Sequence, residues 1–297
     1  MSDTAASLGK KLASAGDLQS VVRTMKAMAA AGLGQYESAV RALDDYYRTV
    51  QLGLVACFRE TPGTGRDGPA RQDQGAIGVV AFGSDQGLVG QFNDVIVDFA
   101  VQALANVPGK KIVWAVGERI EARLADTGLV PGAAFVLPNS IGAITPLVGQ
   151  MLMEMEAQRE KGEIRQLYLF HNRPEAGAIY TPTSQRLLPL DDVWRRNLAA
   201  IPWPGKCLPE VMQDGKGTLL AFLREYLFVS LFRTCAESLA SENASRLAAM
   251  QRAEKNIDEL LADLNLTFHR LRQGSIDEEL FDLISGFEAL TPTPAAK

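Results

Sequence analysis

Cysteine and histidine are scarce in this 297-residue sequence, which has three of the first and two of the second. Cys57, Cys207 and Cys235 are odd in number, far apart and without a C-x-x-C spacing. Such cysteines predict reduced thiols in a cytosolic setting rather than a disulfide framework or a zinc site. His171 and His269 are too few and too distant in sequence for a histidine cluster. We therefore expect no metal and no cofactor.

A long apolar run is also missing. The most apolar stretch, residues 219–232, is short and contains Arg224 and Glu225, whereas a membrane-spanning helix needs roughly 20 apolar residues. Residues 1–11 lack the apolar segment of a secretory signal. We expect a soluble chain without direct membrane insertion, which meets a membrane only through partners. A formal net charge of −5 gives no electrostatic reason to expect nucleic-acid binding.

Proline is absent from two long stretches, residues 1–60 and 210–288. In both stretches apolar residues step by three and four, which is typical of coiled-coil helices. The first seam comprises Val22, Met25, Ala29, Gly32, Tyr36, Ala39, Leu43, Tyr46 and Val50, and the second comprises Ile257, Leu260, Leu264, Thr267 and Leu271, widened by Leu261 and Phe268. At about 1.5 Å per residue the two helices would reach about 65 Å and 110 Å, so the second has more length than the first can cover.

Glycine within the first helix needs a compensating contact. Gly32 and Gly34 each cost about 1 kcal/mol of helix propensity relative to alanine. Close packing of a partner helix against this small-residue part of the seam would offset that cost.

The middle region, residues 76–192, alternates strand and helix patterns between two linkers, residues 61–75 and 193–209. We predict strands at 77–82, 111–116, 133–137, 165–170 and 178–188, and helices at 93–105, 118–126 and 142–161. Such alternation favours an α/β sheet of largely parallel strands. The simplest arrangement winds the N-terminal helix (1–60) antiparallel on the C-terminal helix (210–288) as a coiled-coil shaft, with a Rossmann-like α/β domain inserted between them.

Three sequence blocks resemble the γ subunits of F-type ATP synthases. They are residues 23–31 (RTMKAMAAA), residues 84–93 (SDQGLVGQFN) and residues 237–250 (ESLASENASRLAAM), the last continuing through 272–276 to 284–286. Their order and spacing span nearly the whole chain. Departures from the family pattern stand at Gln86, Val89, Gln91, Asp277, Phe287, Gly32 and Gly34, with a tail at 291–297. These departures favour a divergent branch such as the alternate, N-type ATPases.

The resemblance implies a central-stalk rotor subunit that is not itself an enzyme. It would couple ion translocation through a membrane ring of c subunits to the conformational cycle of catalytic β subunits. Its partners would be the α and β subunits, the ε subunit and the c ring, at the cytoplasmic face of a bacterial inner membrane. The subunit-interface residues that the resemblance implies are Arg23, Met25, Lys26, Arg272, Gln273 and Asp277.

Other interpretations stay open for several of these features. The glycine-rich loop at 83–90 lies between a predicted strand and helix, where a phosphate could bind, but it has neither a Walker lysine nor a G-x-G-x-x-G pattern. A tight turn that packs the α/β domain on the shaft is favoured. Arg23, Lys26 and Arg272 could equally be solvated charges, and Met25 a core residue. Two further hypotheses are a Rossmann-like nucleotide-binding enzyme with helical extensions and a coiled-coil adaptor.

Overall fold

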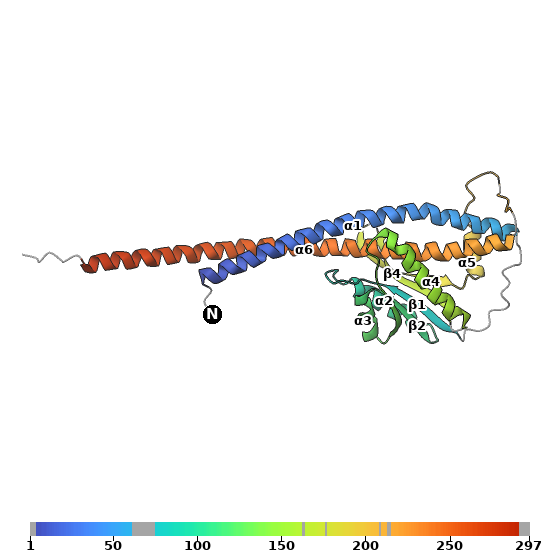
Figure 1. Cartoon of the computed structure of the whole chain (residues 1–297), viewed down its shortest axis with the longest axis horizontal. Coiled ribbons are helices and arrows are strands. Elements are labelled where there is room, and N and C mark those ends of the chain that lie inside the picture. The colour runs from blue at the N-terminus through green and yellow to red at the C-terminus, as the bar shows by residue number, and fades with distance from the viewer. Residues whose placement is uncertain are drawn as a thin grey trace, which may run out of the picture. The chain divides into compact units, whose positions relative to one another are not determined.

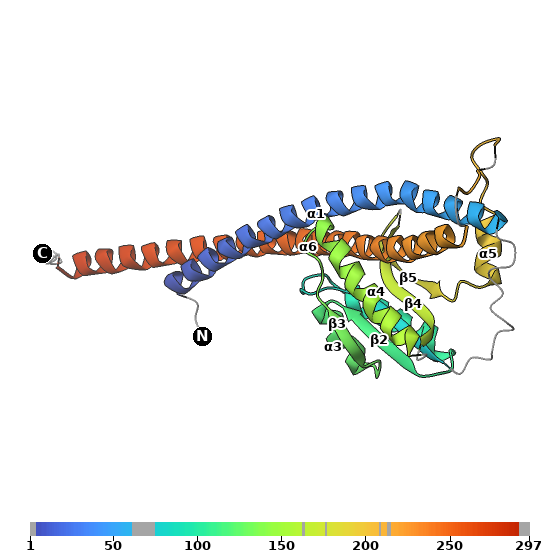
Figure 2. The same ribbon diagram turned by 45° about the vertical axis from the view of Figure 1, so that its right-hand side comes forward.

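The computed structural model describes residues 4–60, 75–161, 164–175, 177–207, 209–212 and 215–290 (Figures 1 and 2). Its elements are α1 (Ala5–Glu60), β1 (Ala76–Phe82), α2 (Phe92–Ala105), β2 (Lys111–Val116), α3 (Glu118–Asp126), β3 (Pro131–Phe135), the 3-10 turn η1 (Ile141–Ala143), α4 (Ile144–Glu160), β4 (Ile164–Glu175), β5 (Ala178–Leu188), α5 (Asp192–Ala199) and α6 (Gly215–Leu290). Two compact units result. One is Ala29–Leu247, and the other consists of the described residues of Met1–Met28 and Ala248–Lys297. We call them the sheet unit and the helix-pair unit.

The sheet unit contains one five-stranded sheet in the order β3-β2-β1-β4-β5. β1 pairs in parallel with β2 and β4, β2 pairs in parallel with β3, and β5 is antiparallel to β4. Six of the seven residues of β1 are buried, as expected for a central parallel strand covered on both faces. The predicted sheet of largely parallel strands is therefore confirmed, with β5 as its antiparallel edge.

Helices cover both faces of the sheet. One face carries Ile77, Val79 and Ala81 of β1 and packs on α2 and α3, whereas the other face carries Val80 and Phe82 and packs on α4 and on the sheet-unit segments of α1 and α6. Successive residues of a strand point to opposite faces, so a single strand supplies both cores. Figure 1 shows α3 on the side of the sheet away from α1 and α6.

Within the sheet unit, α1 and α6 run antiparallel. The ring centroids of Tyr47 and Tyr226 lie 5.7 Å apart, and a Cβ built on Gly53 would lie 2.3 Å from the ring of Phe222. A Cβ on Gly32 would lie 2.7 Å from the side-chain oxygen of Asn243. The close helix approach expected at Gly32 is thus present. Gly34 has no atom within 4 Å of its built Cβ, so packing does not account for that glycine.

The helix-pair unit is an antiparallel pair made from the beginning of α1 and the end of α6. Val22, Met250 and Ile257 form its buried core, flanked by Met25, Ala249, Ala253 and Leu261. Gln19 Nε2 donates to Asp258 Oδ1 and Arg23 Nε to Glu254 Oε1. Partner numbers in α6 fall as those in α1 rise, which is the antiparallel register that the sequence predicts.

Some expectations were wrong in detail. The predicted linker at 193–209 contains α5, whose start is capped because the Trp194 N–H donates to Asp191 Oδ1 at 2.9 Å. β3 begins at Pro131 rather than at residue 133. Four seam positions face solvent, namely Tyr46, Leu260, Thr267 and Leu271. Residues 61–74 of the first linker and the tail at 291–297 lie outside the described residues.

Candidate functional site

The predicted interface residues near the start of the chain surround one carboxylate of α6. Arg23 Nε donates to Glu254 Oε1 at 3.0 Å, and Lys26 Nζ forms an ion pair with the other oxygen of Glu254. Hydrogen bonds from Lys26 and then Arg23 hold the pKa of Glu254 below its ordinary value. The side chain of Arg23 remains 57% exposed and that of Lys26 35%. Both cations therefore link the two helices and also present charge outward.

Met25 has a packing role in this structure. It lies against the core formed by Val22, Met250 and Ile257. Its neighbour in the sequence motif, Met28, is 69% exposed. Core packing, the interpretation that the heptad spacing favoured for Met25, is confirmed.

Arg272, Gln273 and Asp277 lie on the last part of α6, where each residue from His269 to Phe287 is exposed. The structure gives these three residues no hydrogen bond or ion pair with another described side chain, and it does not bring them into contact with Arg23 or Lys26. Apolar residues of the same segment are also exposed, among them Leu271, Ile276, Leu280, Phe281, Leu283 and Ile284. Contiguous exposed apolar residues of this kind are typical of an interaction surface.

The glycine-rich loop after β1 is held by its own polar groups. The Ser84 N–H donates to Asn93 Oδ1 at 3.0 Å, and Asn93 Nδ2 donates to Ser84 Oγ at 2.8 Å. Asp85 reaches across to the neighbouring loops, where its carboxylate accepts from the N–H of Glu118 at 2.9 Å and of Leu137 at 3.1 Å. Glu118 is the first residue of α3, so a protein carboxylate already occupies the anion-binding end of that helix.

The carboxyl ends of β1 and β4 form the place where an open α/β sheet normally binds a ligand. β2 and β3 follow on one side of β1, and β4 lies on the other, which makes this edge a topological switch point. The last β1–β4 pair is Ala81 with Phe170. His171 and Asn172 are therefore the first residues of β4 after its pairing with β1 ends.

In this structure α6 occupies that edge. His171 Nε2 donates to Glu237 Oε2 of α6 at 2.7 Å, since an ionised carboxylate can only accept. Ser245 Oγ of α6 donates to the carbonyl of Val89 at 2.6 Å. Asn172 Nδ2 donates to the carbonyl of Phe92, the first residue of α2, at 2.9 Å. We call this arrangement the sheet-edge contact. The tight-turn interpretation of the loop, which packs the α/β domain on the helix, is confirmed.

Ion pairs also connect α1 to the sheet-edge contact. Arg233 of α6 donates through Nε to Glu237 Oε1 at 2.9 Å and pairs through its terminal nitrogen with Asp44 of α1 at 2.8 Å. Burial alone would raise the pKa of Glu237, but the hydrogen bond from His171 and the charges of His171, Arg233 and Arg173 outweigh it and lower the pKa. Glu237 is therefore an ionised, buried anion that β4 and α6 share.

Sequence reasoning had not selected Asp85, His171, Arg233 or Glu237. An indication was available in α6, where Ser230, Thr234, Ser238, Ser241 and Ser245 recur at helical spacing and are all buried. Of the residues in this polar stripe, Ser245 donates to the carbonyl of Val89 in the loop after β1, whereas Thr234 donates to the Ser230 carbonyl of its own helix. Among the described residues no group of three or more histidines, cysteines or carboxylates could hold a metal ion. No helix in the described ranges is long and apolar enough to cross a bilayer.

Comparison with known proteins identifies the family. The model of the ATP synthase family matches residues 4–290. ATP synthase gamma chains of Granulibacter bethesdensis and Polynucleobacter necessarius are 27% and 23% identical, each over 94% of this chain and 97% of the relative. Among solved structures, a chain of the rotor of Euglena gracilis mitochondrial ATP synthase matches with a TM-score of 0.61 at 18% identity, covering 91% of this chain and 97% of that one. A chain of the Tetrahymena thermophila central stalk and c-ring structure gives 0.57 at 20% identity, covering 78% and 99%.

The fold defines a class of protein in which two long terminal helices pair and an α/β domain is inserted between them, as in those central stalks. The expected fold class is thereby confirmed. Within that class, this chain belongs to the ATP synthase γ-chain family.

Proposed function

We propose that this chain is the rotor subunit that couples ion translocation through a membrane ring of c subunits to the conformational cycle of catalytic β subunits. It performs no catalysis itself. Its angle within a ring of α and β subunits selects which β site is open, and this selection is a coupling free energy between distant sites. The assembly lies at the cytoplasmic face of a bacterial inner membrane, to which the chain is peripheral. The 23–28% identity of the curated relatives supports a divergent branch, for which the departures from the family pattern suggest the N-type ATPases.

The observation that carries the proposal is the exposed apolar end of α6. In the helix-pair unit Gln19 pairs with Asp258 and Arg23 with Glu254. Continued to Ala5, where α1 begins, this register places the end of α1 opposite α6 near Arg272. Among the described residues, no other helix continues this pairing along α6 beyond that point. A coiled-coil segment with exposed leucine, isoleucine and phenylalanine needs a surrounding apolar wall, which a ring of α and β subunits would supply.

Charged residues on the same helices would set the rotational contacts. By the family resemblance, Arg272, Gln273 and Asp277 would meet a β-subunit loop, where the arginine could form a paired hydrogen-bond contact with a carboxylate. Arg23, Met25 and Lys26 would lie where the helix pair enters the ring, with Met25 supporting the helix that presents the two cations. Asp277 cannot donate as the usual threonine does, so its contact depends on a donor from the partner.

The sheet unit would receive torque from the c ring and the ε subunit. For torque to reach α6, the α/β domain must be fixed to that helix. The sheet-edge contact supports this role, because Glu237, Ser245 and Arg233 join α6 to β4, to the loop after β1 and to α1. The same contact argues against the nucleotide-binding enzyme, since the chain's own carboxylate and helix occupy the ligand edge of the sheet.

Two experiments test the proposal. The tagged chain, purified from its own host, is expected to bring down α and β subunits with ATPase activity. If the chain is recovered alone and binds nucleotide, the rotor assignment is wrong and the enzyme hypothesis replaces it.

Truncation tests the role of the α6 end. A chain that stops after Glu279 is expected to fold and assemble, because the exposed side chains of Leu280, Phe281, Leu283 and Ile284 contribute little to the stability of the isolated chain. ATP hydrolysis should then proceed with reduced ion pumping in inverted vesicles. The substitution Lys255→Gln, at an exposed upstream residue of α6, serves as the control. Unchanged pumping by the truncated complex, or failure of the truncated chain to fold, would contradict the assignment.

A further inference from the structure

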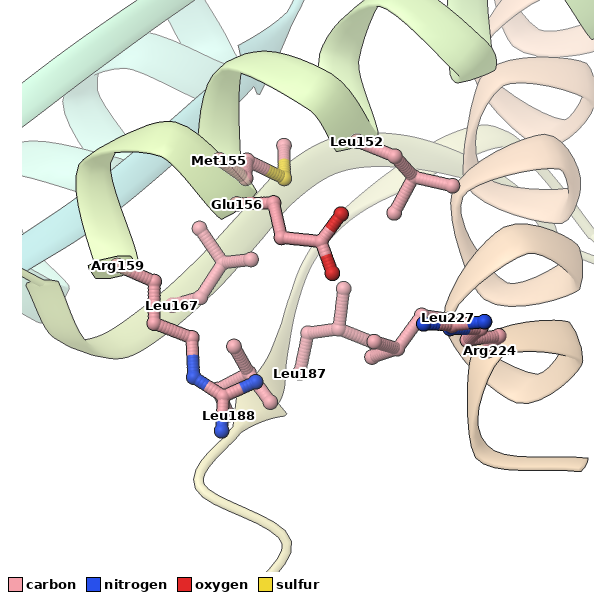
Figure 3. A pocket seen from close by; sticks show the side chains of 9 residues that line it. All are labelled: Leu152, Met155, Glu156, Arg159, Leu167, Leu187, Leu188, Arg224 and Leu227. Atoms are coloured by element: carbon pink, nitrogen blue, oxygen red, sulfur yellow. The ribbon is translucent and has the colours of Figure 1, made fainter. Parts of the chain in front are cut away.

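A pocket of about 190 Å³ opens in the sheet unit between α4, the strands β4 and β5, and α6. Figure 3 shows its side chains converging from these elements. Its walls are apolar and are formed by Leu152, Met155, Leu167, Leu187, Leu188 and Leu227. Met155, Leu167 and Leu187 are buried, and the other three pack against the same core. The pocket therefore reaches the main hydrophobic core rather than lying on the surface.

Three charged side chains border this apolar space. Glu156 and Arg159 come from α4, and Arg224 comes from α6. In Figure 3 the Glu156 carboxylate and the Arg224 guanidinium lie on facing sides, with Arg159 beside Leu188. None of the three forms an ion pair with a described residue. The rim therefore carries two positive charges and one negative charge, which makes it net positive.

We propose that this pocket binds a small amphipathic carboxylate, with its apolar chain against the leucines and its carboxylate at the Arg224 guanidinium on the rim. Apolar walls with a few polar groups at one side are the usual construction of small-molecule sites. Guanidinium groups match carboxylates through paired, charge-assisted hydrogen bonds. The site takes an anion because cations outnumber the anion on the rim.

The volume sets the size of the ligand. A water molecule occupies about 30 Å³ of liquid, and a methylene group is of similar size. The pocket therefore accommodates about six such groups. The seven alkyl carbons of an eight-carbon carboxylate, with the carboxylate at the rim, are close to this number, whereas a long membrane acyl chain does not fit inside the pocket.

Occupancy would connect α4 to α6. Arg224 and Leu227 belong to α6, whereas Met155, Glu156 and Arg159 belong to α4. A ligand held by both helices binds only the folded sheet unit and so stabilises it by mass action. Binding at this pocket is independent of assembly with other subunits, so its failure would leave the proposed rotor function untouched.

The test uses the full-length chain with octanoate as the probe, and with octanol and octylammonium as neutral and cationic probes of equal chain length. Ligand-observed saturation-transfer NMR gives the affinity, and thermal unfolding gives the stabilisation. We expect saturable octanoate binding with a Kd on the order of 1 mM or below, as typical ligand efficiencies allow for a molecule of this size. Octanol should bind more weakly and octylammonium least.

Rim substitutions should change octanoate affinity in opposite directions. Arg224→Gln should weaken binding roughly tenfold, since it removes a charge-assisted hydrogen bond. Glu156→Gln should strengthen binding by about threefold, since it removes an exposed like charge. Arg252→Gln, elsewhere on α6 and exposed, is the control and should leave affinity unchanged. Equal affinity in all four proteins, or tighter binding of octylammonium, would overturn the proposal.

Discussion

Removal of the Glu237 carboxylate tests the sheet-edge contact directly. The Glu237 side chain is 6% exposed and that of His171 3%. In Glu237→Leu, His171 loses its carboxylate partner in a buried place, and Arg233 keeps only Asp44, whose side chain is 51% exposed. Breaking a buried ion pair by removing one partner costs about 3–5 kcal/mol. Because Arg233 keeps one partner, we expect Glu237→Leu to lower the free energy of unfolding by about 3 kcal/mol, the lower end of this range.

Glu237→Gln should cost less. The amide keeps the length of the side chain and can still accept from Arg233. The amide NH2 would then face His171 Nε2, which can accept only if the ring proton lies on Nδ1, and Nδ1 has no hydrogen-bond partner among the described residues. Weakened hydrogen bonding and the lost charge assistance together should cost about 1–2 kcal/mol.

Urea unfolding followed by tryptophan fluorescence measures both losses. Trp114 is 1% exposed and lies in the core that α6 helps to form, so its emission reports on the sheet unit. Glu254→Leu is the matched control on the same helix, and the exposure of its partner Arg23 predicts a much smaller effect. If Glu237→Leu lowers the free energy of unfolding no more than Glu254→Leu does, the sheet-edge contact is not what fixes α6 to the sheet.

Three further predictions concern packing, the glycine-rich loop and acid stability. In denaturant unfolding, Gly53→Ala should destabilise by about 1–3 kcal/mol through overpacking on Phe222, whereas Gly34→Ala, which meets open space, should stabilise by up to about 1 kcal/mol through helix propensity; destabilisation by both would refute the packing argument. Asp85→Ala should cost about 1–2 kcal/mol, because two backbone N–H groups lose their acceptor, and slower amide exchange at Glu118 would contradict this. Since the pKa of Glu237 is lowered in the folded chain from 4.5, its stabilisation is present above that value and is lost as the pH falls through the folded pKa. The stability difference between wild type and Glu237→Gln should therefore shrink in acid, and a difference independent of pH would refute the linkage.

Local patterns in the sequence predicted much of the fold. The helices α1 and α6 lie in the two proline-free stretches, and the short β-branched run at 77–82 is the central strand β1. These features depend on the period of apolar residues, which a sequence displays directly. The antiparallel pairing followed from the chain order, because two long helices without other partners must bury their seams on each other.

Long-range polar contacts could not be predicted in the same way. His171 and Glu237 are 66 residues apart, and no local pattern indicates that they meet. The exposure of Tyr46 has a similar cause. Its hydroxyl donates to Glu225 at 2.7 Å at the margin of the helix contact, so a heptad count alone assigned it to the seam. The close contact between Gly53 and the ring of Phe222 could not be predicted either, because the position of a glycine in the sequence does not indicate which side chain packs against it.

The polar stripe of α6 explains why the ligand edge of this sheet holds a helix. The carboxyl edge of a parallel sheet presents loop backbone groups that need partners, and a purely apolar helix would leave them unsatisfied. Ser245 supplies a hydroxyl to the carbonyl of Val89, and Glu237 supplies a carboxylate to His171. A fully apolar α6 face could not supply these hydrogen bonds. Ser245 and Glu237 therefore help to hold the α/β domain in one orientation on α6.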